Sequence, residues 1–343
     1  MKKTTAFFLT IGVVSMIIGG IGSAVYFRRA EQSMTDTKKE SYTVKNNQNL
    51  KEIHLTLTGN AEYYINTEST NKVVMNTRSS APVSIKSSLK VDEKNGQLLV
   101  SANGNRNEKK LGSFKFDFIN FDRGSSVSLT IPDNAERIVI DGQSSGRINL
   151  SGIDAKNITV KTENADVDAN SLNTEKLALE TTNGYLNVYT DVHADKASFK
   201  TTNGDINLND FVASTWSAIT TSGDISLESV KGISTIETMN GDISASNLKG
   251  EATIKSTNGS FDLYGSEIPK LLNVTTQQGD INLYTDEILY DIAINSKTTL
   301  GDSTIFGKER TSFKRGKGSR VFDLQSNSGD ISIEGPVDSE DEE

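Results

Sequence analysis

One short phrase recurs along this chain at an almost constant spacing. TTNGDINL at 201–208 returns as TTSGDISL at 220–227, TMNGDISA at 238–245, STNGSFDL at 256–263 and TQQGDINL at 276–283. Aligned on its turn glycine, which we call the pivot, the phrase has ten copies, at Gly146, Ala165, Gly184, Gly204, Gly223, Gly241, Gly259, Gly279, Gly301 and Gly329. The first seven intervals are 18–20 residues, and the last two lengthen to 22 and 28. Such steady self-similarity is typical of a solenoid, in which each repeat packs on its neighbours.

Each repeat predicts two short strands that meet at the pivot. After Gly204, the apolar Ile206 and Leu208 alternate with polar residues, which is the pattern of a strand with one buried face. Three residues before the pivot, the inward position is Thr162, Thr181, Thr201, Thr220, Thr238, Ser256, Thr276, Thr298 or Ser326. Two residues after it, the inward position is Ile148, Val167, Leu186, Ile206, Ile225, Ile243, Phe261, Ile281, Ser303 or Ile331.

Two architectures fit these paired strands. Asn-Gly between alternating strands is also a strong hairpin signal, and hairpins would give an antiparallel meander or sandwich. Parallel stacking in register instead places similar side chains at the same inward position of successive coils, as the two columns require. We therefore predict an all-β, single-stranded β-solenoid (β-helix) of about ten coils of 18–20 residues. The pivot glycines are expected to supply a positive φ, which Asn also tolerates.

The N-terminus predicts a membrane anchor. After a short flank at 1–5, residues 6–27 form an uncharged apolar run between Lys2 and Lys3 on one side and Arg28 and Arg29 on the other. This run is long enough for a transmembrane helix and longer than the apolar core of most cleaved signal peptides, which are the alternative. The flanking basic residues nearly balance, so the positive-inside rule does not fix the orientation.

Composition shifts divide the rest of the chain. The polar residues 28–41 are predicted to be a linker, 42–140 an irregular β region that forms the cap or first coils, 141–335 the regular solenoid and 336–343 an acidic tail. The net charge of −9 argues against general nucleic-acid binding, which needs a basic face. The absence of cysteine excludes disulfides and thiolate chemistry. No motif indicates a cofactor.

The irregular β segment, SLTIP at 128–132 and the in-phase T-x-N-G-D-I repeats together resemble the bacterial putative-adhesin family of β-strand repeats. That family includes LiaG-like proteins of cell-envelope stress operons in Gram-positive bacteria, and the resemblance covers most of residues 50–335. It implies a membrane-anchored domain with the repeats outside the cell. It implies no catalytic or ligand-binding residues.

Two outward columns are candidates for chemistry. Asp205, Asp224 and Asp242 stand at one position of successive coils, so they could bind a divalent cation on the solenoid edge, or each could cap its own turn. The threonines Thr182, Thr202, Thr221, Thr257 and Thr299 form a hydroxyl strip that could bind glycan or wall polymer, or be ordinary β surface. His54 and His193 lie far apart, outside any metal-spacing cluster, and Trp216 is interpreted as core rather than as a sugar-stacking surface.

The sequence thus favours a single-pass, membrane-anchored extracytoplasmic protein that binds or scaffolds without catalysis at the bacterial envelope, in adhesion or the response to envelope stress. Its expected partners are the membrane, through the N-terminal helix, and cell-wall polymer or a surface protein. Two alternatives stay open, namely a polysaccharide-active β-helix enzyme and a purely structural stalk. An enzyme would present clustered acidic and basic groups in a cleft, whereas the outward columns here are mostly Thr, Asn and Ser.

Overall fold

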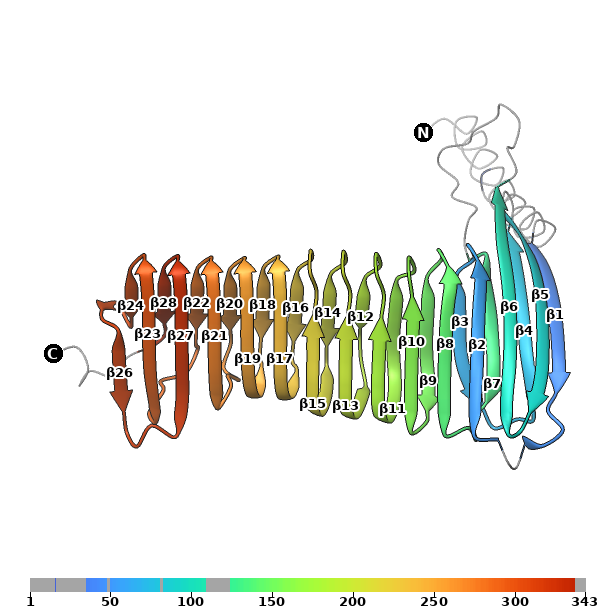
Figure 1. Ribbon diagram of the computed structural model, residues 1–343, viewed down its shortest axis with the longest axis horizontal. Coiled ribbons are helices and arrows are strands. Elements are labelled where there is room, and N and C mark those ends of the chain that lie inside the picture. Colours follow the sequence, from blue (N-terminus) through green and yellow to red (C-terminus); the bar gives the residue numbers. More distant parts are fainter. Residues whose placement is uncertain (1–15, 17–34, 48–49, 81–82, 109–123, 337–343) are drawn as a thin grey trace, which may run out of the picture.

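The protein is an elongated rod of stacked β-coils in a computed structural model (Figure 1). The structure describes residues 16, 35–47, 50–80, 83–108 and 124–336. The pairing between coils is parallel and in register, for example Ile206 with Ile225 and Ile225 with Ile243. The solenoid prediction is therefore confirmed, and the hairpin alternative is wrong for the repeats.

Each coil contributes one strand to each of two parallel sheets. In spatial order, the long sheet contains β6 (Gln97–Glu108), β2 (Glu52–Gly59), β8 (Arg137–Ser144), β10 (Asn157–Thr162), the second half of β11 (Val167–Glu180), β13 (Val192–Lys200), β15 (Phe211–Ile219), β17 (Lys231–Asn240), β19 (Lys249–Asn258), β21 (Leu271–Gln278), β27 (Arg320–Ser328) and β23 (Ile292–Leu300).

The short sheet lies behind it. In the same order, it contains β7 (Ser126–Pro132), β3 (Tyr63–Glu68), β9 (Ile148–Asp154), the first half of β11, β12 (Leu186–Val188), β14 (Ile206–Asn209), β16 (Ile225–Glu228), β18 (Ile243–Ser246), β20 (Phe261–Tyr264), β22 (Ile281–Tyr284), β28 (Ile331–Glu334) and β24 (Ser303–Ile305).

Antiparallel strands close both ends of the rod. At the N-terminal end, β4 (Lys72–Ser80) pairs with β7, β1 (Thr35–Thr43) pairs with β4, and β5 (Val83–Lys94) pairs with β6. At the C-terminal end, β25 (Lys308–Glu309) pairs with β24 and β26 (Ser312–Arg315) pairs with β23. These strands cover the outer edges of the stack, which would otherwise offer free backbone groups to another chain.

The linker prediction for 28–41 is wrong in its second half. Residues 35–41 belong to β1, whose backbone pairs with β4 from Thr35 to Thr43. The sequence of β1, TDTKKESYT, is polar because both faces of this outermost strand are half or fully exposed. A strand that buries so little lacks the apolar alternation by which strands are recognised.

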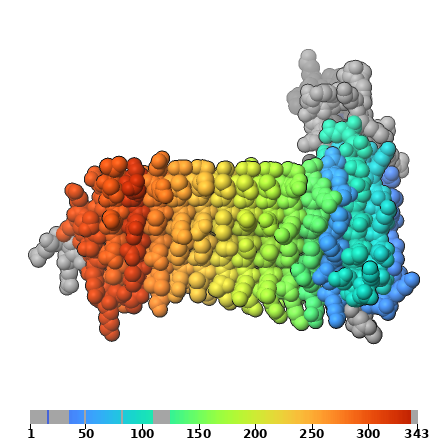
Figure 2. Space-filling view, viewed as in Figure 1, coloured from blue at the N-terminus to red at the C-terminus, as the bar shows by residue number. Residues whose placement is uncertain are grey.

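The coils are not stacked in chain order at either end. Coil β2–β3 lies between coils β6–β7 and β8–β9, and coil β27–β28 lies between coils β21–β22 and β23–β24. Figure 2 shows both insertions as colours out of sequence, a blue stripe between teal and green and a dark red stripe between two orange ones. At each end, the inserted coil therefore pairs through parallel strands with a neighbouring coil on both of its sides.

The core is a double row of aliphatic side chains between the two sheets. The column two residues after the pivot is buried in every coil, from Ile148 to Ile331, and Ser303 is buried with it. Trp216 is 4% exposed and packs edge-to-face on Phe211, with the ring centroids 6.0 Å apart, so its interpretation as core is confirmed. Each buried aliphatic chain contributes about 1.5–3 kcal/mol of burial free energy.

Close packing of each pivot on the adjacent coil explains why glycine recurs better than the expected positive φ does. Gly279, Gly301 and Gly329 have the expected positive φ, of 156°, 159° and 154°, but Gly146, Gly184, Gly204, Gly223, Gly241 and Gly259 do not, so that expectation is wrong for these six. A Cβ added to Gly204 would instead lie 1.9 Å from the carbonyl oxygen of Gly184, because each pivot backbone packs directly on the pivot before it. Positive φ occurs at the other corner of the coil, in Ser171, Asp191, Asp210, Ser229 and Asn247.

Seven side chains of the inward Thr and Ser column donate to the carbonyl oxygen of a pivot on the adjacent coil, whereas the Ser256 hydroxyl makes no hydrogen bond to any described residue. Thr201 Oγ1 donates to the carbonyl oxygen of Gly184 (3.1 Å), and Thr220 Oγ1 donates to that of Gly204 (3.0 Å). The same bond is made by Thr181, Thr238, Thr276, Thr298 and Ser326. This column therefore satisfies carbonyl groups that the tight turn leaves buried.

Candidate functional site

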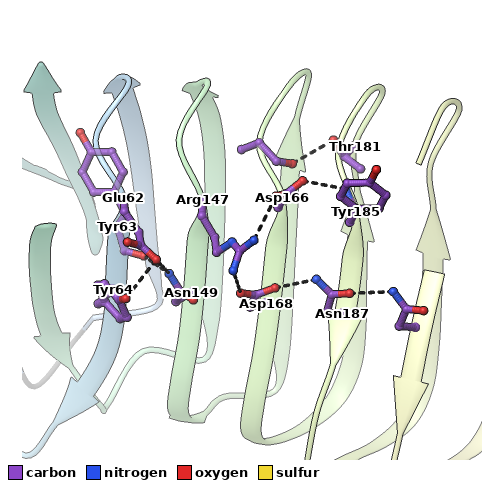
Figure 3. Close-up of polar contacts among 12 residues, drawn as sticks. Glu62, Tyr63, Tyr64, Arg147, Asn149, Asp166, Asp168, Thr181, Tyr185 and Asn187 are labelled. Atoms are coloured by element: carbon purple, nitrogen blue, oxygen red, sulfur yellow. Dashed lines mark hydrogen bonds and ion pairs between the residues drawn. The ribbon is translucent and has the colours of Figure 1, made fainter. Parts of the chain in front are cut away.

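The outward face of the short sheet carries an extended polar network (Figure 3). Arg147 lies in the turn before β9 and contacts two carboxylates of the next coil. Its Nη2 atom lies 3.4 Å from Asp166 Oδ2, and its Nη1 atom lies 3.4 Å from Asp168 Oδ2. Asp168 is only 7% exposed. Burial alone would lower the pKa of Arg147, but the charges of Asp168 and Asp166 outweigh it and raise that pKa. The guanidinium is thus held as a fixed cation at the surface of two adjacent coils.

A ladder of planar side chains extends this network along the rod. Asn187 Nδ2 donates to Asp168 Oδ1 (2.8 Å), and Asn207 Nδ2 donates to Asn187 Oδ1 (2.9 Å). On the other side, Asn149 Nδ2 donates to Glu62 Oε1 (3.2 Å). Asn149, Asp168, Asn187 and Asn207 occupy one outward position on successive coils, where parallel pairing brings equivalent side chains side by side. Glu62 lies beside this column, two residues before Tyr64, which is the residue that pairs with Asn149.

Three exposed tyrosines flank the ladder. Tyr64, Tyr185 and Tyr189 are 44%, 48% and 45% exposed. The Tyr64 hydroxyl donates to Glu62 Oε1 (3.0 Å), and partial burial together with Glu62 raises the pKa of Tyr64. Partial burial and the charge of Asp168 likewise raise the pKa of Tyr189. We call this surface the tyrosine patch: Glu62, Tyr64, Arg147, Asn149, Asp166, Asp168, Tyr185, Asn187 and Tyr189.

The tyrosine patch was not predicted from the sequence. Its members come from 62–64, 147–149, 166–168 and 185–189, and the contribution of 62–64 depends on coil β2–β3 being inserted beside β9. A partial signal was present, because Asn149, Asp168, Asn187 and Asn207 recur at intervals of 19 or 20 residues at one outward position.

The predicted aspartate column has a structural role that differs from the expected one. Asp205 Oδ1 accepts the backbone N–H of Asp224 (2.9 Å), and Asp224 Oδ1 accepts that of Asp242 (2.9 Å). Asp242 Oδ1 accepts the N–H of Ser260 (2.8 Å). Each carboxylate therefore caps the turn of the next coil rather than its own. Across the described part of the chain, no group of three acidic or histidine side chains is arranged to hold a metal ion.

The hydroxyl strip lies along the pivot corner of the rod. Thr221 and Thr257 line a shallow furrow of ≈ 400 Å³, and Thr299 lines a second one of ≈ 310 Å³. Thr275 and Gln277 line both furrows, so the two adjoin. Thr182 and Thr202 continue the strip along the rod and are exposed.

A wider groove follows the opposite corner of the long sheet. It measures ≈ 540 Å³, and its lining includes His193 and charged groups of both signs, Asp195, Lys231, Glu251 and Lys270. His193 Nε2 lies 3.2 Å from Asp191 Oδ1, whereas His54 lies in the long sheet at the N-terminal end, 3.9 Å from Asp141. The two histidines thus belong to separate surfaces.

Apart from residue 16, the predicted membrane helix at 6–27 lies outside the described residues, as does the acidic tail from 337 onward. Within the described ranges, no helix is long and apolar enough to cross a membrane.

The chain matches solved structures from several bacteria. A putative adhesin from Bacteroides fragilis is 15% identical, covers 88% of this chain and 97% of its own, and superposes with a TM-score of 0.33. A putative lipid binding protein from Parabacteroides distasonis is 12% identical over 88% and 97%, with a TM-score of 0.36. A putative cell adhesion protein from Clostridium sporogenes is 12% identical over 88% and 100%, with a TM-score of 0.23. Likeness at this level says nothing about what the present chain binds.

No curated protein matches the chain. The Toastrack DUF4097 family does match it, over residues 50–233 and again over 228–334, which together span both sheets of the rod. The match covers the inserted coil β2–β3 at one end and the inserted coil β27–β28 at the other. The chain therefore belongs to the Toastrack DUF4097 family.

Proposed function

We propose that the protein is a membrane-anchored, non-catalytic binding module that stands outside a bacterial cell and contacts cell-wall polymer through the tyrosine patch. The anchor is the apolar run 6–27, and the rod carries the patch on coils close to its N-terminal end. This role suits the envelope-stress and adhesion functions that the sequence favours.

The observation that supports the proposal is the exposure of three tyrosines around a fixed planar network. Tyrosine offers a large amphipathic ring at a low cost in conformational entropy, and it is enriched with arginine at binding surfaces. Sugar rings present apolar C–H faces that stack on aromatic rings, and their hydroxyls pair with amide and carboxylate groups such as those of Asn187 and Asp168. A face with both kinds of group suits a polyhydroxylated polymer.

The spacing of the coils suits an extended ligand. Adjacent strands lie about 4.8 Å apart, so the four coils from Tyr64 to Tyr189 span roughly 14 Å. Stacked coils present this span without loops that must be ordered on binding, which keeps the entropic cost of association low.

The bonding of the carboxylates favours binding over catalysis. Asp166 Oδ1 accepts the backbone N–H of Tyr185 (3.0 Å), and its other oxygen meets Arg147. Asp168 is shared in the same way between Asn187 and Arg147. A general acid or base must exchange a proton with its substrate, whereas these groups are occupied in holding coils together.

The test is retention of the full-length, detergent-solubilised protein on isolated bacterial cell walls. We expect the double variant Tyr64→Ala/Tyr189→Ala to lose about tenfold or more in affinity, which corresponds to ~1.4 kcal/mol. The matched control is Tyr264→Ala/Tyr284→Ala, because these tyrosines are equally exposed, and Tyr284 pairs with Tyr264 on coils that lack the arginine network.

Three outcomes would count against the proposal. Equal losses in both double variants would mean that binding does not depend on the tyrosine patch. Retention that survives digestion of the wall glycan but not removal of wall protein would identify a surface protein as the partner. Release of soluble sugar during the incubation would support the polysaccharide-active enzyme instead.

A further inference from the structure

The C-terminal end of the rod carries a concentrated positive charge. Residues 307–320, which contain β25 and β26, have six cationic side chains and one carboxylate, Glu309, a net charge of +5 in a chain whose total is −9. We call this segment the basic cap. Its cationic residues are Lys308, Arg310, Lys314, Arg315, Lys317 and Arg320.

Two of these cations share one aromatic ring. The Cζ atom of Arg310 lies 4.5 Å from the centroid of Phe313, and that of Arg315 lies 5.6 Å from it. Burial and the charge of Arg315 lower the pKa of Arg310, as expected for like charges held close together. Covering the end of the core explains the two arginines, because their stems shield Phe313 from water. It does not explain Lys314 and Lys317, which are exposed.

The chain leaves β28 directly beside this cap. Phe306 N donates to the carbonyl oxygen of Ile333 (2.8 Å). A Cβ on Gly335 would lie 3.7 Å from Phe306 Cε1, and the ring of Phe306 lies edge-to-face on Phe313 at 5.0 Å. Only two aromatic rings therefore separate Gly335 from the guanidinium groups of the cap.

The residues that follow have the opposite charge. The segment 337–343, VDSEDEE, contains five carboxylates and no cation, so its charge of −5 equals that of the basic cap in magnitude. An extended chain advances about 3.4 Å per residue, so Glu340 can lie roughly 14 Å from Pro336. That reach is enough to bring several carboxylates over the cap.

We propose that the acidic segment 337–343 docks on the basic cap and neutralises it. Because the segment is tethered beside its site, its effective concentration there is in the millimolar range for a short linker. The segment then acts as a built-in competitor for any polyanion that reaches this end of the rod. This contact is separate from the tyrosine patch, which lies on the N-terminal coils.

The direct test is zero-length carbodiimide cross-linking of the full-length protein in detergent, followed by mass spectrometry. We expect amide links from Glu340, Asp341 or Glu342 to Lys314 and Lys317 at low salt. They should disappear near 1 M salt, where screening acts within about 3 Å. Lys86 and Lys90, exposed at the other end of the rod, serve as control lysines. No links to the cap, or links to the control lysines at the same frequency, would overturn the proposal.

A second measurement compares affinity for inorganic polyphosphate in two charge-matched variants. The first converts Asp338, Glu340, Asp341, Glu342 and Glu343 to the corresponding amides. The control does the same to five exposed acids distant in sequence, Asp36, Asp92, Asp133, Glu163 and Glu175. Both variants gain +5 in net charge, but we expect only the first to bind polyphosphate about tenfold more tightly at moderate salt. Equal affinities in the two variants would contradict the docking.

Discussion

At the scale of single residues, the repeat is explained by contacts between one coil and the next. The tenth pivot is Ala165, but at the nine glycine pivots an added Cβ would lie within 2.3 Å of a carbonyl oxygen of the adjacent coil, which selects glycine there. The inward threonine donates to that same carbonyl, and the outward aspartate accepts the next coil's N–H. The phrase Thr-x-x-Gly-Asp is thus one set of inter-coil bonds, which is why it recurs as a unit.

The close approach of adjacent pivots predicts an unusual ranking of two glycine substitutions. Gly204→Ala should lower the free energy of unfolding by about 3 kcal/mol, because its Cβ meets a fixed backbone carbonyl. Gly152→Ala should cost only about 1 kcal/mol, although Gly152 has a φ of +63°, because its Cβ would meet open space. Urea unfolding followed by circular dichroism measures both. A larger loss in Gly152→Ala would show that conformation, rather than close approach, selects glycine.

The threonine column can be tested with a pair of adjacent residues. Thr220→Val removes the hydroxyl that bonds to Gly204 while keeping the shape, and we expect a loss of ~1–2 kcal/mol in the free energy of unfolding. Thr221→Val, on the exposed neighbour, should change it by less than about 0.5 kcal/mol. Equal losses of unfolding free energy in the two variants, measured by the same urea experiment, would show that the inward hydroxyl does not stabilise the stack.

Tyr63 makes stability sensitive to alkaline pH. Its ring is fully buried, its hydroxyl donates to the carbonyl oxygens of Thr58 (2.7 Å) and Ala102 (3.2 Å), and burial raises its pKa well above the ordinary value. Above pH ~10 the unfolded chain ionises this group while the folded chain does not, so the stability that it contributes falls by up to ~1.4 kcal/mol per pH unit.

The corresponding measurement is the difference in unfolding free energy between the natural protein and Tyr63→Phe. Phenylalanine cannot ionise, so the advantage of the natural protein at pH 8 should shrink as the pH rises from 10 to 11. A difference that stays constant over that range would mean that Tyr63 titrates alike in the folded and unfolded states.

At the scale of elements, each end of the rod contains a coil inserted between two others, namely β2–β3 at the N-terminal end and β27–β28 at the C-terminal end. The C-terminal coil β27–β28 supplies the neighbouring parallel strand for both β23 and β24, and β23 does not pair with β21. The last strands in the chain therefore hold in place a coil that precedes them. A stack built in chain order would lack this dependence.

Truncation distinguishes the inserted topology from a stack in which the coils follow chain order. A chain that ends at residue 319 lacks β27 and β28, so coil β23–β24 loses its contact with the rest of the stack. We expect hydrogen exchange in 292–305 to become fast, while 206–284 stays protected. The control is a chain that ends at 286, which should keep the same protection up to β22. Continued protection of 292–305 in the longer truncation would contradict the inserted topology.

The sequence predicts this level of structure only in part. The period, the inward columns and the parallel stacking follow from local alternation, because each regular coil repeats the same bonds. The insertions of coils β2–β3 and β27–β28 do not follow from local alternation, because coils of similar sequence can pair with several neighbours. The repeat pattern holds no information about the order in which the coils stack. The strand β1 was missed because it is polar on both faces, and the tyrosine patch was missed because Tyr64 reaches it only through the inserted coil β2–β3.

At the scale of the whole molecule, the tyrosine patch and the basic cap lie far apart along the axis of the rod. The tyrosine patch lies on coils near the N-terminal end, and the basic cap lies at the other end, about ten coils away. With strands ~4.8 Å apart, this distance is roughly 45–50 Å. If residues 6–27 anchor the chain, the proposed polymer site stands near the membrane and the cap points away from it.

The measurement that tests this account most directly is protease shaving of intact cells that make the protein, followed by detection of the solenoid domain with a specific antibody. We expect external protease to remove residues 50–334 while a short membrane-bound fragment with the N-terminus remains. A domain that resists protease until the membrane is opened would place the rod inside the cell, where it could not meet cell-wall polymer, and would contradict the proposed function.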